Sequence, residues 1–261
     1  MKISLIISTY NWPKALHLCL MSIVNQTKMP DEVIVADDGS SDDTRQLVER
    51  MAASFPCRLK HVWHEDKGFR LSAIRNKAVR DYCTGDYLIF IDGDIIVERH
   101  FVEDHAKMAR PGYFVIGSRT KLKSSYTKRV IDNQITKLKF YNNGVRRKEN
   151  GLHIPFLWVL TKYLYHSKRF YGRGANMAMY MRDFAEVNGF DEDMVGYGSE
   201  DFDIFNRLYN IGLKRNYAKF MAIEYHLYHP KSDFTPANSA ILYGNLSRKR
   251  CCNGLRLIAH E

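Results

Sequence analysis

Short apolar runs alternate with segments of helical periodicity through the first half of the chain. The runs are typical of buried strands, and the segments between them repeat apolar residues at i, i+3 and i+4 spacing. Strands are predicted at residues 3–8, 32–36, 58–63, 87–91 and 113–116. Helices are predicted from Pro13, from Ser41 or Asp42 to about Ala53, and over residues 72–82 and 101–108. Repeated strand–helix–strand units predict an α/β fold with a mostly parallel, doubly wound central sheet flanked by helices.

Polar motifs directly follow three of these predicted strands. They are Ser-Thr-Tyr-Asn at residues 8–11, Asp-Asp-Gly-Ser at 37–40 and Asp-Gly-Asp at 92–94. In doubly wound sheets, ligands bind beyond the carboxyl ends of the strands. Three separate segments therefore indicate one site at one edge of the sheet.

Asp92 and Asp94 are separated by one glycine at the end of a predicted buried strand. Two carboxylates in this arrangement can face the same cleft. A hard divalent cation prefers such oxygen ligands and keeps open positions for phosphate oxygens. A tight turn is the other interpretation, because Asp-Gly is a common hairpin pair. The neighbouring strand-end motifs favour the cation site.

A second acidic pair, Glu200 and Asp201, begins a helix predicted over residues 200–211 and closed by Gly212. Ser199 is a suitable N-cap, and acidic side chains in a first turn favour the helix dipole. A carboxylate here can equally take the proton from an attacking hydroxyl. Spacing alone leaves both interpretations open.

Four further side chains are candidates for ligand binding. Tyr10 can stack on a nucleobase or lie in the core, and Asp38 can accept a hydrogen bond from a base or cap a loop. His226 and His229 can complete the coordination of a cation or have a structural role. The residues by themselves do not decide among these alternatives.

The chain has 261 residues and a formal net charge of +10, so its partners are expected to be anionic. Nucleic acid fits this charge, but the sequence contains no nucleic-acid-binding motif. A dinucleotide-dependent oxidoreductase is disfavoured because no glycine-rich loop follows the first strand. The five cysteines form no CxxC pair, and no export signal or membrane span is visible. These features predict a cytoplasmic protein without disulfides.

Seven segments carry a resemblance to a known family. They are ISTYN (7–11), VADDGSSDDT (35–44), DKGFRLSAIRNKA (66–78), GDYLIFIDGDIIV (85–97), GRGANMAM (172–179), GFDEDMVGYGSEDFD (189–203) and YHLYHP (225–230). In their order and spacing the chain resembles the family 2 inverting glycosyltransferases, which have the GT-A fold. Its latter portion is similar to the galactosyltransferase-type C-terminal region of β-1,4-galactosyltransferases and chondroitin polymerase domains.

The resemblance implies a UDP-sugar site. The residues so implied for nucleotide-sugar binding are Ser8, Tyr10, Asp38, Arg70, Asp92 and Asn176. Asp38 would contact the uracil, with Tyr10 stacked on it, and Arg70 would help to hold the base or the diphosphate. Asp92 would bind the ribose, and Asn176 would face the donor sugar from the loop 172–176.

The resemblance also implies a bound Mn²⁺ or Mg²⁺ ion and a pair of catalytic carboxylates. Asp94 would ligate the metal together with His226, and His229 is the reserve candidate for the second ligand. Asp201 would be the catalytic base, and Glu200 would grip the acceptor.

The implied organisation is one compact catalytic domain in four parts. Residues 1–117 form a nucleotide-sugar-binding half, and residues 118–170 form a basic, aromatic and irregular insert over the active site. Residues 171–245 form an acceptor-binding and catalytic half, followed by a basic tail at 246–261. The insert does not match the family core, so the sequence leaves the acceptor undetermined.

The implied function is inverting, metal-dependent transfer of a hexose or N-acetylhexosamine from a UDP-sugar to a carbohydrate acceptor. The expected setting is the synthesis of bacterial cell-surface polysaccharide, lipopolysaccharide or lipooligosaccharide. The composition of the insert suits an anionic or lipid-linked acceptor, and its basic segments suit peripheral contact with the inner face of the membrane. No nucleic-acid partner is expected. The alternatives are a non-enzymatic basic nucleic-acid-binding protein and a nucleotide-sugar-binding pseudoenzyme.

Overall fold

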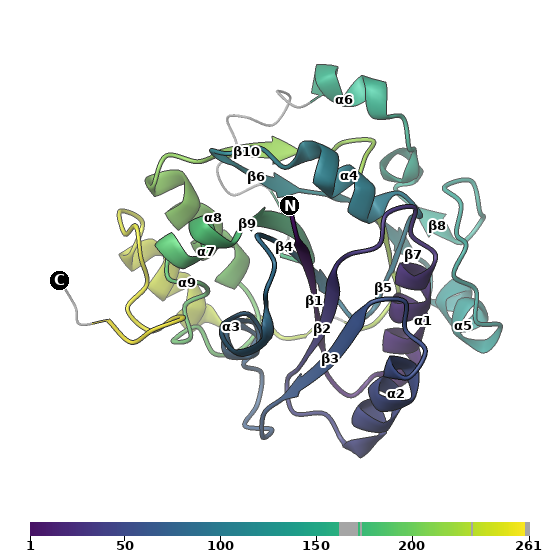
Figure 1. Ribbon diagram of the computed structural model, residues 1–261, viewed down its shortest axis with the longest axis horizontal. Coiled ribbons are helices and arrows are strands. Elements are labelled where there is room, and N and C mark those ends of the chain that lie inside the picture. The colour runs from purple at the N-terminus through teal and green to yellow at the C-terminus, as the bar shows by residue number, and fades with distance from the viewer. Residues whose placement is uncertain (162–171, 173, 231, 259–261) are drawn as a thin grey trace.

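A seven-stranded sheet with the strand order β10-β6-β9-β4-β1-β2-β3 runs through the centre of the molecule (Figure 1). The computed structural model describes residues 1–161, 172, 174–230 and 232–258. The strands of this sheet are β1 (Ile3–Thr9), β2 (Glu32–Asp37), β3 (Arg58–Trp63), β4 (Tyr87–Asp92), β6 (Tyr113–Ile116), β9 (Asn176–Tyr180) and β10 (Lys214–Tyr217). All five strands predicted from the first half are present.

Most strand pairs in this sheet are parallel, as the sequence predicts. β1 pairs in parallel with β2 and β4, β2 pairs in parallel with β3, and β6 pairs in parallel with β10. β9 is the exception, because it runs antiparallel between β4 and β6. It was not predicted, since its five residues, NMAMY, are too few to show a clear period.

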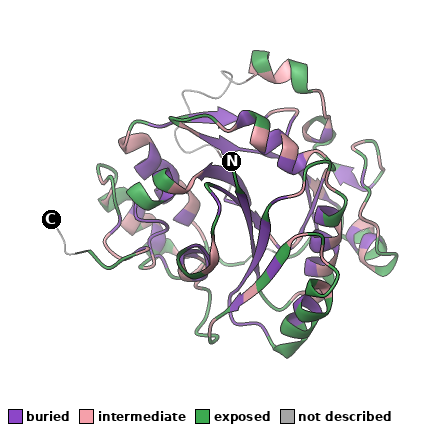
Figure 2. Ribbon diagram, in the orientation of Figure 1, coloured by how far each residue is buried: buried purple, intermediate pink, exposed green. Residues whose placement is uncertain are grey.

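Helices cover both faces of the sheet (Figures 1 and 2). One face packs against α1 (Pro13–Val24), α2 (Asp42–Ala52) and α4 (Phe101–Met108). The other face packs against α3 (Leu71–Tyr82), α7 (Met181–Glu186) and α8 (Glu200–Asn210). Alternate residues of β1 enter the two cores, with Leu5 and Ile7 in the first and Ile6 in the second. This is the doubly wound arrangement that the alternating pattern predicts.

A second, four-stranded sheet has the order β5-β11-β7-β8. Its strands are β5 (Ile95–Val97), β11 (Ile223–His226), β7 (Ser118–Leu122) and β8 (Val145–Arg146). β11 is antiparallel to β5 and parallel to β7. Because β5 begins directly after Asp94, this pairing brings residues 223–226 back to the strand-end motif of β4.

The prediction that residues 118–170 are irregular is wrong for the part that the structure describes. Residues 118–161 contain β7, α5 (Ser124–Asp132), β8, the 3₁₀ helix η1 (Lys148–Gly151) and α6 (Pro155–Thr161), whereas 162–170 lie outside the described residues. The strand β7 escaped prediction because two of its three inward residues, Ser118 and Thr120, are polar. An alternating strand pattern depends on apolar residues facing inward.

The C-terminal part of the chain packs against the second core. A short helix, α9 (Pro236–Gly244), contacts α8, and Cys251 is buried against the carbonyls that follow α7. All five cysteines lie in the described part of the chain and are free thiols. Among the described residues, no helix is both long and apolar enough to cross a bilayer.

A buried ion pair within α8 fixes this helix to the loop after α7. The Arg207 guanidinium is buried and donates to Asp203 at 2.5 and 2.8 Å. It also donates to the carbonyls of Val187 and Gly189, both at 2.6 Å. One buried cation thus satisfies three acceptors from two segments.

We expect Asp203→Asn to destabilise the fold by about 3–5 kcal/mol, because it leaves the buried Arg207 cation without a counter-charge. The free energy of unfolding is measured by urea denaturation. Asp132→Asn is the matched control, since Asp132 forms an ion pair of the same i,i+4 spacing with Lys128 at the surface. Equal stability of the two variants would contradict the prediction.

Candidate active site

The carboxyl ends of β1, β2 and β4 meet at one edge of the central sheet. Ser8 is level with Asp92 on β4, and Thr9 is level with Asp37 on β2. The Gly93 N–H donates to the Ser8 carbonyl at 2.7 Å, so the chain that follows β4 lies against the end of β1. A Cβ on Gly93 would be 3.1 Å from this carbonyl oxygen and from Thr9, which is tight enough to favour glycine. The three strand-end motifs therefore form one site.

Asp38 lies at the β2 end of this site, beneath the loop that carries Arg70. Its carboxylate accepts hydrogen bonds from the Arg70 backbone N–H at 2.8 Å and from His64 Nε2 at 2.6 Å. Burial of the side chain raises the pKa of the Asp38 carboxyl. Tyr10 lies on the β1 side, its hydroxyl donates to Asp66 at 2.9 Å, and the residue is 52% exposed. The exposed Tyr10 ring rules out a core role for this tyrosine and is available for stacking.

Arg75, a residue that sequence reasoning missed, lies at the centre of the site. It comes from α3 and is 1% exposed. Its Nε donates to Ser8 Oγ at 2.9 Å, and Nη2 donates to Asp92 Oδ1 at 3.0 Å. Nη1 has no hydrogen-bond partner among the described residues. A buried cation with one unused donor favours an anionic ligand beside it.

The sequence does contain a signal for Arg75. Ser72, Arg75 and Val79 follow i, i+3, i+7 spacing on α3, and all three are buried. An arginine on the inward face of an amphipathic helix is uncommon unless it is paired. Arg70, which the sequence favoured instead, lies outside this core: its backbone holds Asp38, and its guanidinium donates to the Glu65 carbonyl.

Glu200 and Asp201 approach the same guanidinium from α8. The Gly174 N–H donates to Asp201 Oδ2 at 2.9 Å. A Cβ built on Gly174 would lie 2.9 Å from Asp201 Cβ and 3.3 Å from Arg75 Nη1. Arg75 therefore has Asp92 on one side and Asp201 on the other. The two acidic groups, far apart in the chain, lie across one site.

Glu200 differs from its neighbour in environment. It is 9% exposed, and its Oε2 has no hydrogen-bond partner within the described part of the chain. Burial, and then repulsion from Asp201, raises the pKa of Glu200 to about 7. Ser199 is not the side-chain cap that the sequence suggested: its φ is 73°, and in the described structure its hydroxyl makes no capping bond.

Asp94 and two histidines form a candidate metal centre at the start of β5. Asp94 Oδ2 lies 3.2 Å from His226 Nε2 and 3.2 Å from His229 Nε2. Asp94 Oδ1 is buried without a hydrogen-bond partner among the described residues. The antiparallel pairing of Ile95 with His226 places the first histidine, so the fold brings both predicted ligands to one carboxylate.

This set of side chains fits a divalent cation. One ligand atom from each of the three residues lies within 4.8 Å of the others. Burial lowers the pKa of His226 to about 3, so its imidazole is neutral and can coordinate a cation at physiological pH. Two imidazoles and one carboxylate leave further coordination positions for ligand oxygens. Both histidines, the first choice and the reserve, are therefore candidate ligands.

Asn176 is placed differently from the prediction. It begins β9 and is 2% exposed. Its Oδ1 lies 3.0 Å from His105 Nε2, and its Nδ2 donates to the Ala222 carbonyl at 2.9 Å. Both ends of the amide are thus used inside the protein. This environment indicates a structural role rather than contact with a donor sugar.

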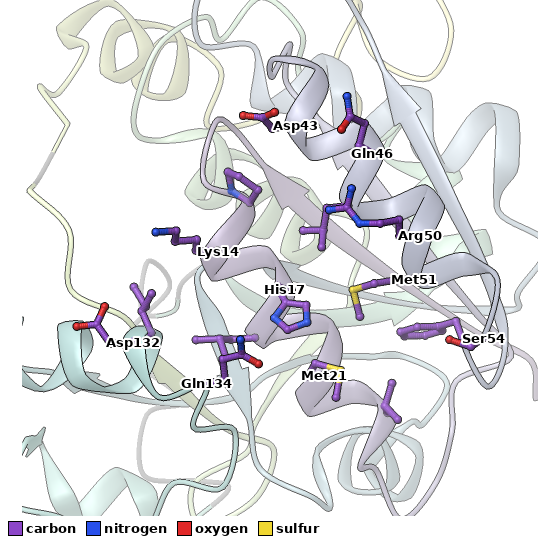
Figure 3. Close-up of a pocket in the computed structure, with 16 residues that line it drawn as sticks. Lys14, His17, Met21, Asp43, Gln46, Arg50, Met51, Ser54, Asp132 and Gln134 are labelled. Atoms are coloured by element: carbon purple, nitrogen blue, oxygen red, sulfur yellow. The ribbon is translucent and has the colours of Figure 1, made fainter.

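A separate groove lies on the far side of α1 and α2 (Figure 3). Lys14 and His17 line it from α1, Arg50 lines it from α2, and Asp132 and Gln134 line it from the end of α5 and the chain that follows. None of the lining residues belongs to the three strand-end motifs. The groove is therefore distinct from the candidate active site.

Comparisons with known proteins place the chain among glycosyltransferases. The chain is 30% identical to validoxylamine A glucosyltransferase of Streptomyces hygroscopicus subsp. limoneus, over 81% of this chain and 48% of that protein. It is 25% identical to chondroitin synthase of Escherichia coli, over 80% of this chain and 32% of that protein. The chain thus spans about half or less of the length of these relatives.

The structure is similar to that of GalNAc-T7 with UDP, GalNAc and Mn²⁺, with a TM-score of 0.65 and 15% identity over 94% of this chain and 48% of that one. This likeness shows the GT-A fold. Residues 158–230 match a family described as the N-terminal domain of galactosyltransferase. Residues 4–182 match glycosyl transferase family 2. This range contains the whole of the predicted insert, so the expectation that the insert does not match the family is wrong. The chain belongs to glycosyl transferase family 2.

Proposed function

We propose that this glycosyltransferase is an inverting, metal-dependent enzyme that moves a hexose or N-acetylhexosamine from a UDP-sugar to a carbohydrate acceptor. The observation that carries the proposal is the position of Arg75 between Asp92 and Asp201. A donor-binding carboxylate and a candidate base are thereby held on either side of one buried cation. Transfer needs both groups close to one anomeric carbon.

The donor nucleotide would lie along the strand ends. The exposed Tyr10 ring offers a stacking surface. Each carboxylate oxygen of Asp38 accepts one hydrogen bond, from His64 or from the Arg70 backbone, and can accept a second one from a nucleobase. Asp92 would take the ribose, and the unused Nη1 of Arg75 would donate to the diphosphate. UDP is the proposed nucleotide because the similar GalNAc-T7 structure contains it.

Asp94, His226 and His229 would hold Mn²⁺ or Mg²⁺ next to the diphosphate. A bound divalent cation would supply charge neutralisation for the departing diphosphate. The three side chains lie just before β5 and at or just after the end of β11, so their positions depend on the second sheet.

Asp201 would take the proton from the acceptor hydroxyl. The Gly174 and Phe202 N–H groups donate to its two oxygens at 2.9 and 2.8 Å, which orients the carboxylate. The deprotonated oxygen would attack the anomeric carbon from the side opposite the diphosphate and invert its configuration. Glu200 would hold the acceptor through its second oxygen.

The proposed acceptor is an anionic or lipid-linked glycan, in bacterial cell-surface polysaccharide or lipooligosaccharide synthesis. Arg146, Arg147 and Lys148 are exposed on β8 and η1, and Phe156 and Leu160 are 75% and 72% exposed on α6. Basic and apolar side chains on one segment suit peripheral contact with an anionic membrane.

A panel of UDP-sugars, each with and without Mn²⁺ and scored for UDP release, tests this function. We expect Asp94→Asn to lower release by about 100-fold or more, because the variant loses a metal ligand. Asp43→Asn on the exposed start of α2 is the control, and thermal unfolding confirms that both variants fold. Full activity of Asp94→Asn, or no release from any UDP-sugar, would contradict the proposal. The second result would favour a pseudoenzyme.

Loss of the base is tested separately from loss of the metal. We expect Asp201→Asn to lower kcat by about 10²–10⁴-fold with little change in the affinity for UDP. Affinity for UDP is measured by calorimetry in the presence of Mn²⁺. Normal kcat in this variant would exclude Asp201 as the base.

The pH dependence of transfer tests Glu200. Because its pKa is raised to about 7 and the acceptor is held by the ionised form, kcat/KM should rise as the pH increases through about 7. In Glu200→Gln this limb should disappear, since the side chain no longer titrates. A limb that persists unchanged in the variant would assign it to another group.

The two arginines near the site provide a matched comparison. We expect Arg75→Lys to lower kcat/KM for the UDP-sugar by about 10–100-fold, because lysine cannot bond Ser8, Asp92 and a diphosphate oxygen together. Arg70→Lys should have a smaller effect, since the Arg70 contact with Asp38 is made by its backbone. Larger losses in Arg70→Lys than in Arg75→Lys would reverse the assignment.

A further inference from the structure

A second group of metal-ligating side chains lies away from the active site. Glu98, His100 and His153 each offer one ligand atom, and these three atoms lie within 4.8 Å of one another. His100 Nδ1 is 3.1 Å from both carboxylate oxygens of Glu98. The rings of His100 and His153 are stacked, with their centroids 4.6 Å apart.

A buried carboxylate orients the third member of this group. His153 Nε2 lies 2.9 Å from Asp104 Oδ2, which also accepts the Ala222 N–H at 2.9 Å. Because Nε2 is used in this way, Nδ1 is the His153 nitrogen left for a metal ion. Carboxylates commonly orient metal-binding histidines through the second ring nitrogen. Asp104 is fully buried, and its Oδ1 has no hydrogen-bond partner among the described residues, so a positive charge nearby would be stabilised.

The group is separate from the Asp94 centre. Asp94 precedes β5 and Glu98 follows it, so the strand holds the two residues roughly 13 Å apart along its length. The side chains of Glu98, His100 and His153 are 17%, 30% and 22% exposed, so an ion can enter from solvent. No contact with the donor site is needed for such binding.

We propose that Glu98, His100 and His153 bind Zn²⁺, with water in the fourth position. Two histidines and one carboxylate form a common ligand set for zinc. Ligand atoms around tetrahedral zinc lie about 3.3 Å apart, so the side chains must move on the order of 1 Å towards one another. Rotation of the partly exposed His100 ring out of its stack with His153 provides this movement.

Bound zinc would join two segments of the fold. Glu98 and His100 lie between β5 and α4, whereas His153 lies between η1 and α6. The ion would therefore fix the start of α6 to the body of the protein. Stabilisation of the folded state is the expected consequence, since His153 is far from Glu98 and His100 in an unfolded chain.

The experiment separates this site from the Asp94 centre by using Asp94→Asn as the background. We expect Zn²⁺ at about 100 times its Kd to raise the Tm of Asp94→Asn on the order of 5 °C. The rise should be absent in Asp94→Asn/His100→Gln and in Asp94→Asn/Glu98→Gln. His17→Gln in the same background is the matched control, because His17 lines the separate groove on α1 and belongs to neither group of ligands, and it should keep the full rise.

Zinc content, measured by elemental analysis after dialysis, gives a second readout. We expect two Zn²⁺ ions per chain in the wild type, one in Asp94→Asn, one in His100→Gln and none in the double variant. Far-UV circular dichroism confirms that each variant is folded. Zinc content that falls to zero in Asp94→Asn, or that is unchanged by His100→Gln, would overturn the proposal. In either case the three proposed ligands and Asp104 form only a hydrogen-bonded network of carboxylates and histidines.

Discussion

The buried guanidinium of Arg75 is the interaction on which the arrangement of the site depends. It bonds the end of β1 through Ser8 and the end of β4 through Asp92, and it lies beside Asp201 on α8. Removing a cation from water is costly unless its donors are used. The protein uses two of the three guanidinium nitrogens and leaves Nη1, which lies near Asp201, without a hydrogen-bond partner among the described residues. The same charge therefore holds the strands together and creates the need for an anionic ligand.

The second sheet extends this dependence to the candidate metal centre. The chain leaves the central sheet after β4, and the antiparallel pairing of β5 with β11 brings His226 level with Ile95. The Leu227 N–H donates to the Asp94 carbonyl at 3.0 Å, which fixes the turn of chain that carries His229. Two short strands thus bring together ligands that are more than one hundred residues apart in the chain.

The sequence predicts the central sheet well and the second sheet hardly at all. Runs such as YLIFI are buried on both faces, so their apolar character is continuous and easy to recognise. β7 of the second sheet has polar inward residues, and β9, the antiparallel strand of the central sheet, is short. The strand character of both comes from pairing that only the folded chain provides. The strand-end carboxylates could be recognised from the sequence because ligands bind beyond the carboxyl ends of strands in doubly wound sheets. Arg75 was not, because its function depends on burial rather than on a motif.

Burial also explains why the pKa values of a histidine and a carboxyl group in this site are shifted in opposite directions. Removal from water disfavours whichever form of a side chain is charged. The same effect lowers the pKa of His226 to about 3, which leaves a neutral imidazole for a cation, and raises the pKa of Glu200 to about 7, which allows it to titrate near neutral pH. Arg75 acts in the other direction on Glu200, since its positive charge favours the ionised carboxylate. The pKa of Glu200 is therefore set by desolvation and repulsion from Asp201, which raise it, against the buried Arg75 cation, which lowers it, and a ligand bound at Nη1 would shift that balance.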